Sequence, residues 1–217
     1  RNTFEKLNID FTYNNRRDYR ELLLNTKCIS ENISGVILFD ETIKQKTKAG
    51  QLFTDLLNKD NVLIGIKVDE GTLEFKKDSK ELVTDGINDL DNRCREYNRL
   101  GATFTKWRAA FPISNTTPTD QCIDINVNLL SEFAKISQAN YLVPIVEPDV
   151  LMEGSHTIDD CFNITLDIQK KLFIKLIEKD VNLKATILKC NMILPSNDGR
   201  NSASSNEIAQ KTLDCLS

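Results

Sequence analysis

Strand-sized apolar runs alternate along this chain with longer segments that have the spacing of amphipathic helices. The runs are continuous and rich in β-branched residues, which is typical of strands buried on both faces of a sheet. Because the intervals between them are long enough for a helical crossover, they predict parallel strands joined by βαβ units and the α/β fold class. Five strands are expected, over residues 35–39, 62–66, 102–108, 142–146 and 185–188.

The intervening helices are marked by apolar stripes and by capping residues. Thr117 is expected to cap one helix with Pro118 at its first position, and Thr157 is expected to open another. A capping-box pattern begins at Ser204, ahead of a last helix. Helices are predicted over residues 14–24, 87–100, 120–134 and 158–176 and after residue 204.

Alternating strands and helices allow two architectures, the open doubly wound sheet and the (β/α)8 barrel, and glycine usage distinguishes between them. An open doubly wound sheet usually has a glycine-rich phosphate-binding turn after a strand, but the chain has neither G-x-G-x-x-G nor a Walker loop. It holds 8 glycines in 217 residues, about half the ~7% average. This favours the parallel (β/α)8 TIM barrel, incomplete here because five strands are counted where eight are needed. We expect residues 1–217 to form a single domain that is the central segment of a longer barrel.

Composition excludes several classes of partner. With 28 Lys and Arg against 32 Asp and Glu, the net charge is −4, so no basic face is expected and nucleic acid is not an expected partner. No apolar run approaches the ~20 residues of a membrane helix, so no membrane partner is expected, and the charged first residues do not resemble a secretory signal. A cytoplasmic location is expected.

The cysteines and the single histidine argue against a metal centre. The six cysteines are too widely spaced for a C-x-x-C site, and His156 is the one histidine. Neither a metal nor another cofactor is expected, and the thiols are expected to be reduced. His156 is expected to be structural or exposed and not catalytic.

Charged residues follow each apolar run, and three pairs of them are spaced i, i+2. Residues at this spacing lie on one face of a strand, and at the carboxyl end of a barrel strand that face points into the mouth. Any one pair is explained as well by a solvated strand end, but the repetition favours a shared site. The charges that follow the five runs are Asp40 and Glu41, Lys67 and Asp69, Lys106 and Arg108, Glu147 and Asp149, and Lys189.

Lys189 lies between apolar residues, so its ammonium is expected to be held in an apolar wall. Burial lowers the pKa of a lysine, and the nearby Lys106 and Arg108 would act in the same direction. A neutral amine is what Schiff-base chemistry with a carbonyl substrate requires. Glu147 on the neighbouring strand could carry the protons of imine formation, and Arg108 could bind an anion. An ordinary salt bridge between Lys189 and Glu147 is the alternative, and the two interpretations are compatible.

Seven segments resemble, in order and spacing, the class I fructose-bisphosphate aldolase family. Lys-Trp-Arg, Pro-Ile-Val-Glu-Pro and Leu-Lys-x-Asn-Met at barrel-strand spacing are the most specific of them. The segments are Asn15-Arg16-Arg17, Gly35-Val36-Ile37-Leu38-Phe39 with Glu41-Thr42, Gly65-Ile66-Lys67-Val68-Asp69, Arg93-Cys94, Lys106-Trp107-Arg108, Val143-Pro144-Ile145-Val146-Glu147-Pro148 and Leu188-Lys189-Cys190-Asn191-Met192.

The resemblance implies a (β/α)8 barrel and a glycolytic lyase that needs no metal. Its reaction would be the reversible cleavage of fructose 1,6-bisphosphate into dihydroxyacetone phosphate and glyceraldehyde 3-phosphate. A sugar-phosphate substrate, a homotetramer and a cytoplasmic location are implied with it. The implied roles are Schiff-base lysine for Lys189, main acid and base for Glu147, catalytic lysine for Lys106, and substrate or phosphate binding for Arg108, Lys67 and Asp69.

The chain also departs from the family pattern. The strand that ends in the family's Ala-Asp-Glu-Ser motif is expected before Arg1, and two more strands are expected after Ser217. Cys190 replaces the proline that usually follows the Schiff-base lysine, and Lys184-Ala185 replaces the usual Glu-Gly. A second hypothesis is therefore a diverged or truncated paralogue without catalysis that serves as a protein-interaction scaffold. A third is another Schiff-base barrel lyase with a smaller substrate.

Overall fold

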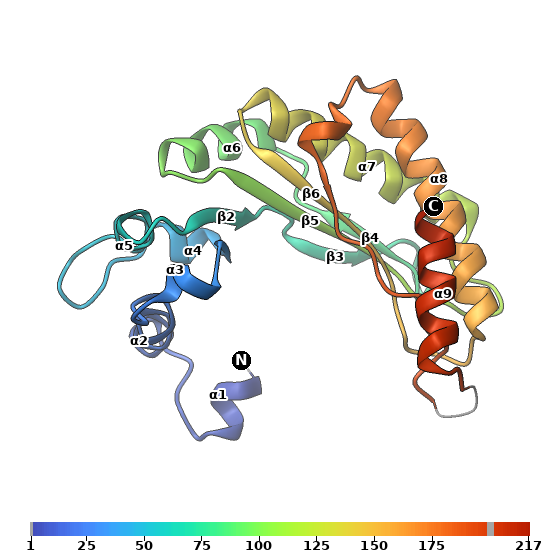
Figure 1. The fold of residues 1–217 in the computed structure, drawn as a ribbon, viewed down its shortest axis with the longest axis horizontal. Helices are drawn as coiled ribbons and strands as arrows, with labels where there is room; N and C mark the ends of the chain where they lie inside the picture. Colours follow the sequence, from blue (N-terminus) through green and yellow to red (C-terminus); the bar gives the residue numbers. More distant parts are fainter. Residues whose placement is uncertain (1, 199–201) are drawn as a thin grey trace.

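The computed structural model describes residues 2–198 and 202–217 (Figure 1). The strands are β1 Gly35–Leu38, β2 Leu63–Lys67, β3 Gly71–Glu74, β4 Leu82–Asp85, β5 Phe104–Phe111, β6 Val143–Val150 and β7 Ile187–Leu188. The helices are α1 Asn2–Lys6, α2 Tyr13–Leu24, α3 Ile29–Asn32, α4 Asp40–Ile43, α5 Phe53–Lys59, α6 Leu90–Arg99, α7 Asp120–Ala139, α8 Ile158–Glu178 and α9 Ser205–Leu216, with a 3-10 turn at Leu183–Ala185.

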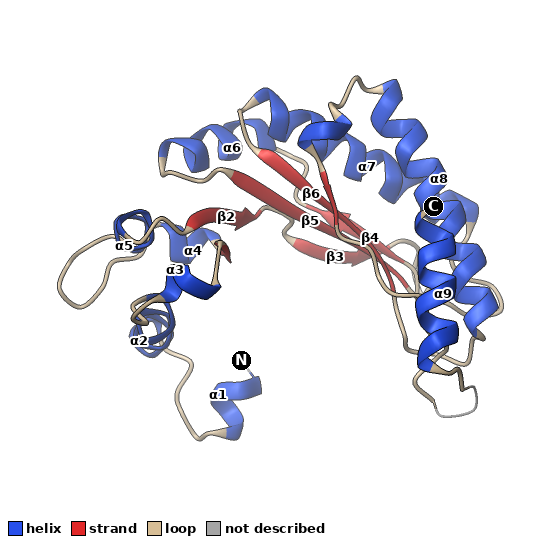
Figure 2. Cartoon of the chain, in the orientation of Figure 1, coloured by secondary structure: helices blue, strands red, loops and turns tan. Residues whose placement is uncertain are grey.

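The five predicted strands form one parallel sheet in the order β1-β2-β5-β6-β7. Each strand therefore lies beside the next predicted one along the chain, as is usual for consecutive βαβ units. Helices α6, α7 and α8 follow one side of this sheet, and α9 lies beside α8 (Figures 1 and 2). The α/β class and the parallel sheet are confirmed.

The two faces of β5 have different surroundings because side chains alternate along a strand. Trp107 is fully buried and stacks on Phe133 of α7, with the ring centroids 5.6 Å apart. Its neighbours Lys106 and Arg108 point to the opposite face. Because α7 packs on the face of β5 that carries Trp107, the predicted site residues Lys106 and Arg108 lie on the opposite face.

Gly65 allows β2 and β5 to pair closely. Gly65 and Phe104 are register partners, and the Phe104 ring covers the position that a side chain would occupy. A Cβ atom at residue 65 would lie 2.1 Å from a ring carbon of Phe104. The glycine is therefore needed for space.

Two local predictions are wrong. β1 is not buried on both faces, since Ile37 is 43% exposed; β1 is an edge of the sheet formed by the described residues. The cap of α7 is Thr119 and not Thr117, because the Thr119 side chain accepts a hydrogen bond from Cys122 N, while Pro118 precedes the cap in a cis peptide. The capping residue Thr157 of α8 is confirmed and forms a capping box with Asp160.

An antiparallel hairpin, β3 with β4, was not predicted. Its sequence is rich in charged residues and lacks the apolar alternation that marks a strand. Polar contacts hold it beside β5: Thr84 Oγ1 donates to Arg108 O at 2.8 Å, and Asn126 of α7 accepts from Thr84 N at 3.2 Å. The hairpin therefore packs directly next to a predicted site residue.

Candidate active site

Glu147 of β6 is a buried carboxylate that contacts two lysines. Its Oε2 lies 2.6 Å from Lys106 Nζ of β5, and its Oε1 accepts a hydrogen bond from Lys189 Nζ. Burial by itself would raise the pKa of Glu147, but the hydrogen bonds and charges of the two lysines outweigh it and leave the pKa below its usual range. The structure thus brings three predicted catalytic residues into one cluster, with Glu147 ionised at its centre.

Lys189 has a different environment from the one expected. It follows β7 directly, and its backbone N donates to Val146 O at 2.9 Å, which continues the pairing with β6. Its side chain is 58% exposed, so the prediction of an apolar wall is wrong. The reason is that β7 lies at the edge of the sheet in the described part of the chain and is covered by β6 on one side.

The predicted binding residues form a second, neighbouring set. Lys67, the last residue of β2, pairs with the buried carboxylate of Asp69 and donates to its carbonyl at 3.0 Å. Asp69 Oδ2 also accepts from the backbone N of Arg108 at 3.3 Å. The Arg108 guanidinium in turn pairs with Asp149 of β6 at 2.6 Å. Each cation on this face is therefore held by an acidic partner, with Lys67 and Arg108 partly open to solvent.

A cavity of about 380 Å³ opens beside Lys67 and Asp69. Tyr97 OH donates to Asp40 Oδ1 at 3.0 Å in its wall, and Lys44 pairs with the same carboxylate at 2.8 Å. Burial acts to raise the pKa of Asp40, but these two contacts lower it overall. One wall of the cavity therefore carries the ionised carboxylate of Asp40, which Tyr97 and Lys44 hold in place.

The strands continue further than the sequence predicted. The apolar residues Ala109, Ala110 and Phe111 are buried and extend β5 past Arg108. Lys106 and Arg108 lie within β5, as they do in the predicted strand over residues 102–108, and they share one face.

Asp149 was predicted to share a face with Glu147 from its i, i+2 spacing, but no role was predicted for it, and Asn191 was not among the predicted site residues. Asn191 accepts from Val150 N at 3.2 Å and donates to Thr165 Oγ1 of α8 at 3.3 Å, so it fixes the segment that carries Lys189. Nothing in the spacing of Asn191 indicated these contacts.

Other predicted features lie outside this cluster. His156 is buried in the loop before α8, where its carbonyl accepts from Ser196 N at 3.1 Å. All six cysteines are thiols. Among the described residues, no group of three or more His, Cys, Asp or Glu side chains is arranged to hold a metal ion. None of the helices in the described ranges has the length and apolar character needed to span a bilayer.

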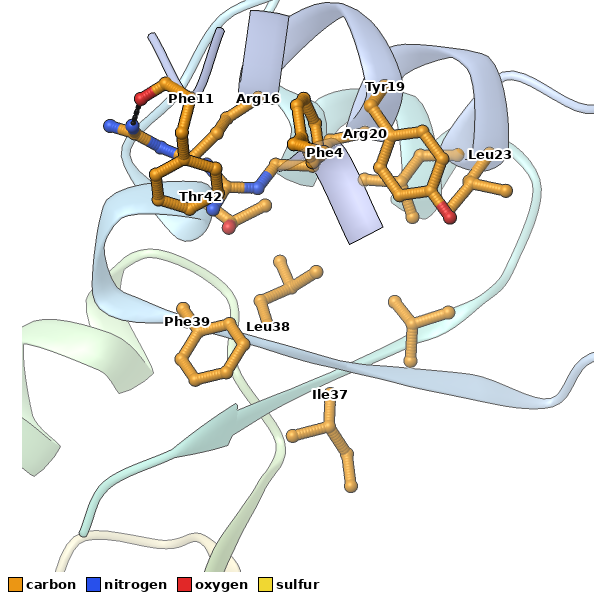
Figure 3. Close-up of a pocket in the computed structure, with 12 residues that line it drawn as sticks. Phe4, Phe11, Arg16, Tyr19, Arg20, Leu23, Ile37, Leu38, Phe39 and Thr42 are labelled. Carbon is orange, nitrogen blue, oxygen red and sulfur yellow. Dashed lines mark hydrogen bonds between the residues drawn. The ribbon is translucent and has the colours of Figure 1, made fainter. Parts of the chain in front are cut away.

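An apolar pocket of about 310 Å³ lies between β1 and α2 (Figure 3). Phe4 and Tyr19 lie across it from Leu38 and Phe39. Phe39 is more than half exposed. The lining lacks the lysines and carboxylates described above, so the pocket is distinct from the Glu147 cluster.

Comparison with known proteins identifies the family of this chain. The family model for glycolytic class I fructose-bisphosphate aldolase matches residues 1–217. A probable class 1 fructose-bisphosphate aldolase of Xylella fastidiosa is 44% identical over 213 residues, which cover 98% of this chain and 64% of the relative. Fructose-bisphosphate aldolase B of Bos taurus is 37% identical, covering 99% and 59%.

A solved structure is similar over nearly the whole chain. The fructose-bisphosphate aldolase of Plasmodium falciparum, solved with TRAP and a small-molecule inhibitor, superposes with a TM-score of 0.94 at 37% identity. The match covers 98% of this chain and 62% of that one, so the chain spans somewhat less than two thirds of the length of these relatives. The chain belongs to the class I fructose-bisphosphate aldolase family.

Proposed function

We propose that this chain provides the Schiff-base centre of an aldolase that reversibly cleaves fructose 1,6-bisphosphate into dihydroxyacetone phosphate and glyceraldehyde 3-phosphate. The observation that supports it best is the carboxylate of Glu147 between Lys106 and Lys189. A lysine beside a carboxylate that can exchange protons is the arrangement that imine formation needs. The identity of the substrate is inferred from the chain's membership in the aldolase family.

Lys189 acts as the nucleophile. Its ammonium gives up a proton, and the amine attacks the ketone carbon, so that a C–N bond forms and the ketone oxygen takes a proton. The carbinolamine then loses water and becomes an imine. Glu147 is within hydrogen-bond distance of the Lys189 nitrogen and carries these protons.

Lys106 keeps the Glu147 carboxylate ionised in its buried position and supplies a positive charge next to the substrate oxygen atoms. Because its side chain is mostly buried, this charge is poorly screened by solvent. Lys106 therefore acts on the reacting groups directly and also through Glu147.

Lys67 and Arg108 bind the substrate's anionic groups, while Asp69 orients Lys67 and the backbone of Arg108. A guanidinium forms two parallel hydrogen bonds to a phosphate, which favours Arg108 as the phosphate contact. Asp149 holds Arg108 at 2.6 Å until phosphate replaces it.

The five-stranded sheet is, on this proposal, part of a (β/α)8 barrel whose other strands adjoin β1 and β7. Apolar side chains at both edges support it, since Ile37 of β1 and Ile187 of β7 are both exposed. The pocket beside β1 would receive apolar side chains of a neighbouring strand. Residues 1–217 would be one domain of a homotetrameric, cytoplasmic glycolytic enzyme.

A cleavage assay with the full-length protein tests the function. Fructose 1,6-bisphosphate should yield triose phosphates at a rate that a metal chelator leaves unchanged. Lys189→Ala should abolish turnover, while Lys184→Ala, which removes an exposed lysine near the same strand, should not. Turnover that persists in Lys189→Ala, or that requires an added metal, would rule out the proposed chemistry.

A further inference from the structure

Arg108 lies at the point where the chain after β2 turns away from β5. The two strands pair in parallel, and Val68 N donates to Lys106 O at 3.1 Å near the end of their pairing. Glu70 N then donates to Asp85 O at 2.9 Å, so the chain turns from β5 toward the β3–β4 hairpin. Because alternate residues of a strand face the same neighbour, the backbone of Arg108 faces the edge of β5 that β2 has left.

Two side chains take the place that a β2 residue would have beside Arg108. Asp69 Oδ2 accepts a hydrogen bond from Arg108 N at 3.3 Å, and Thr84 Oγ1 donates one to Arg108 O at 2.8 Å. A carboxylate suits a backbone N–H and a hydroxyl suits a backbone carbonyl, so both groups of the Arg108 main chain have partners. The main chain that carries the proposed phosphate contact is therefore fixed by side chains from two different segments.

Thr84 is itself held in place by buried polar contacts. Its backbone N donates to Asn126 Oδ1 at 3.2 Å, and Asn126 Nδ2 donates to Leu82 O at 2.8 Å. The fully buried Asn126 amide thus pairs with the backbone of β4 as a neighbouring strand would. The buried carboxylate of Glu81 accepts from Thr119 N at 2.5 Å and anchors the start of β4 to α7. The Thr84 hydroxyl therefore has a fixed position beside β5 (Figure 1).

We propose that Thr84 is a positioning residue for substrate binding, whose hydroxyl fixes the Arg108 main chain so that the guanidinium meets the substrate phosphate. This inference rests on the proposed function and deepens it. The Arg108 side chain is 43% exposed and is held at its far end by Asp149 at 2.6 Å, the contact that phosphate replaces. A main chain without the Thr84 hydrogen bond would lose more conformational freedom when phosphate binds, which weakens binding.

Thr84→Val removes the hydroxyl at nearly constant shape and keeps the backbone N–H. In the full-length protein we expect KM for fructose 1,6-bisphosphate to rise about 3- to 10-fold, as for the loss of one hydrogen bond. The kcat should stay nearly unchanged, because the contact supports binding in the ground state and in the transition state alike. Thr84→Ser keeps the hydroxyl and should keep a normal KM. Thr72→Val is the matched control, because Thr72 of β3 is the exposed register partner of Thr84.

A double-mutant cycle with Arg108→Ala separates positioning from a general structural role. If Thr84 acts through the Arg108 guanidinium, Thr84→Val should raise KM in the unaltered protein but not in the Arg108→Ala background. Circular dichroism checks the fold of each variant, and Thr84→Ala replaces Thr84→Val if the added methyl group prevents folding. An unchanged KM in Thr84→Val, or the same rise in both backgrounds, would overturn the inference.

Calorimetry keeps this test independent of catalysis. In a Lys189→Ala background, Thr84→Val should raise the dissociation constant of fructose 1,6-bisphosphate by the same factor as it raises KM. An unaltered protein that cleaves no fructose 1,6-bisphosphate would refute the proposed function. An unchanged dissociation constant in Thr84→Val would refute the role of Thr84 alone.

Discussion

The carboxylate of Glu147 bridges two lysines that come from the elements on either side of β6: Lys106 of β5, at 2.6 Å, and Lys189 just after β7. One buried negative charge thus balances a mostly buried ammonium and a largely exposed one. The pairing fixes the Lys189 nitrogen next to a group that can accept its proton.

Glu147→Gln should keep the shape of the side chain and remove its ability to exchange protons. We expect kcat to fall by about 10²- to 10⁴-fold, the usual contribution of a general acid or base, while the far-UV circular dichroism spectrum stays unchanged. Glu153→Gln, an exposed change just after β6, is the matched control and should leave kcat unchanged. A Glu147→Gln protein with normal kcat would contradict the proposed role of Glu147.

Stability should depend on pH through the same carboxylate. The lysines hold the folded-state pKa of Glu147 below its ordinary value of 4.5. The folded state therefore gains stability that is fully present above pH 4.5 and is lost as the pH falls through the lower, folded-state pKa. Urea unfolding from pH 6 to pH 3 should show the stability difference between the unaltered protein and Glu147→Gln shrinking at acid pH. A difference that does not vary with pH would refute this linkage.

Gly65→Ala should destabilise the pairing of β2 with β5. The added Cβ would overlap the Phe104 ring, so we expect the free energy of unfolding to fall by about 1–3 kcal/mol, the usual cost of overpacking. In a Phe104→Leu background the same change should cost less, because the ring is gone. Urea unfolding of the four proteins measures this coupling, and strictly additive effects would contradict the packing argument.

The sequence predicts the sheet and the shared face of the site better than it predicts their surroundings. Continuous apolar runs identify strands of a parallel sheet, and the i, i+2 spacing places Lys106 with Arg108 and Glu147 with Asp149 on one face. These signals are local and depend only on strand geometry. The predicted shared face is therefore correct whenever the predicted strands form.

Features that depend on contacts distant in sequence could not be predicted. The exposure of Lys189 depends on what lies beyond β7, and its apolar neighbours in the chain gave the wrong expectation. The cap at Thr119 was missed because Thr117-Pro118 has the same local pattern as a capped helix start. The β3–β4 hairpin is held by the contacts of Thr84 with Arg108 and Asn126, which lie far along the chain.

Asn191→Ala should loosen the segment that carries Lys189. The side chain satisfies Val150 N and donates to Thr165 Oγ1, so its loss leaves a backbone donor without its partner. We expect the free energy of unfolding to fall by about 1–3 kcal/mol and kcat to fall more than KM changes. Asn197→Ala, in the loop that follows, is the control. Equal kcat in both variants would show that Asn191 does not position Lys189.

The most direct measurement is the identity of the lysine trapped when borohydride reduces the complex of the full-length protein with dihydroxyacetone phosphate. The account predicts a single adduct on Lys189, found by peptide mass spectrometry. The adduct should be absent from Lys189→Arg, since a guanidinium cannot form the imine. An adduct on Lys106 or Lys67 of the unaltered protein, with Lys189 unmodified, would contradict the account.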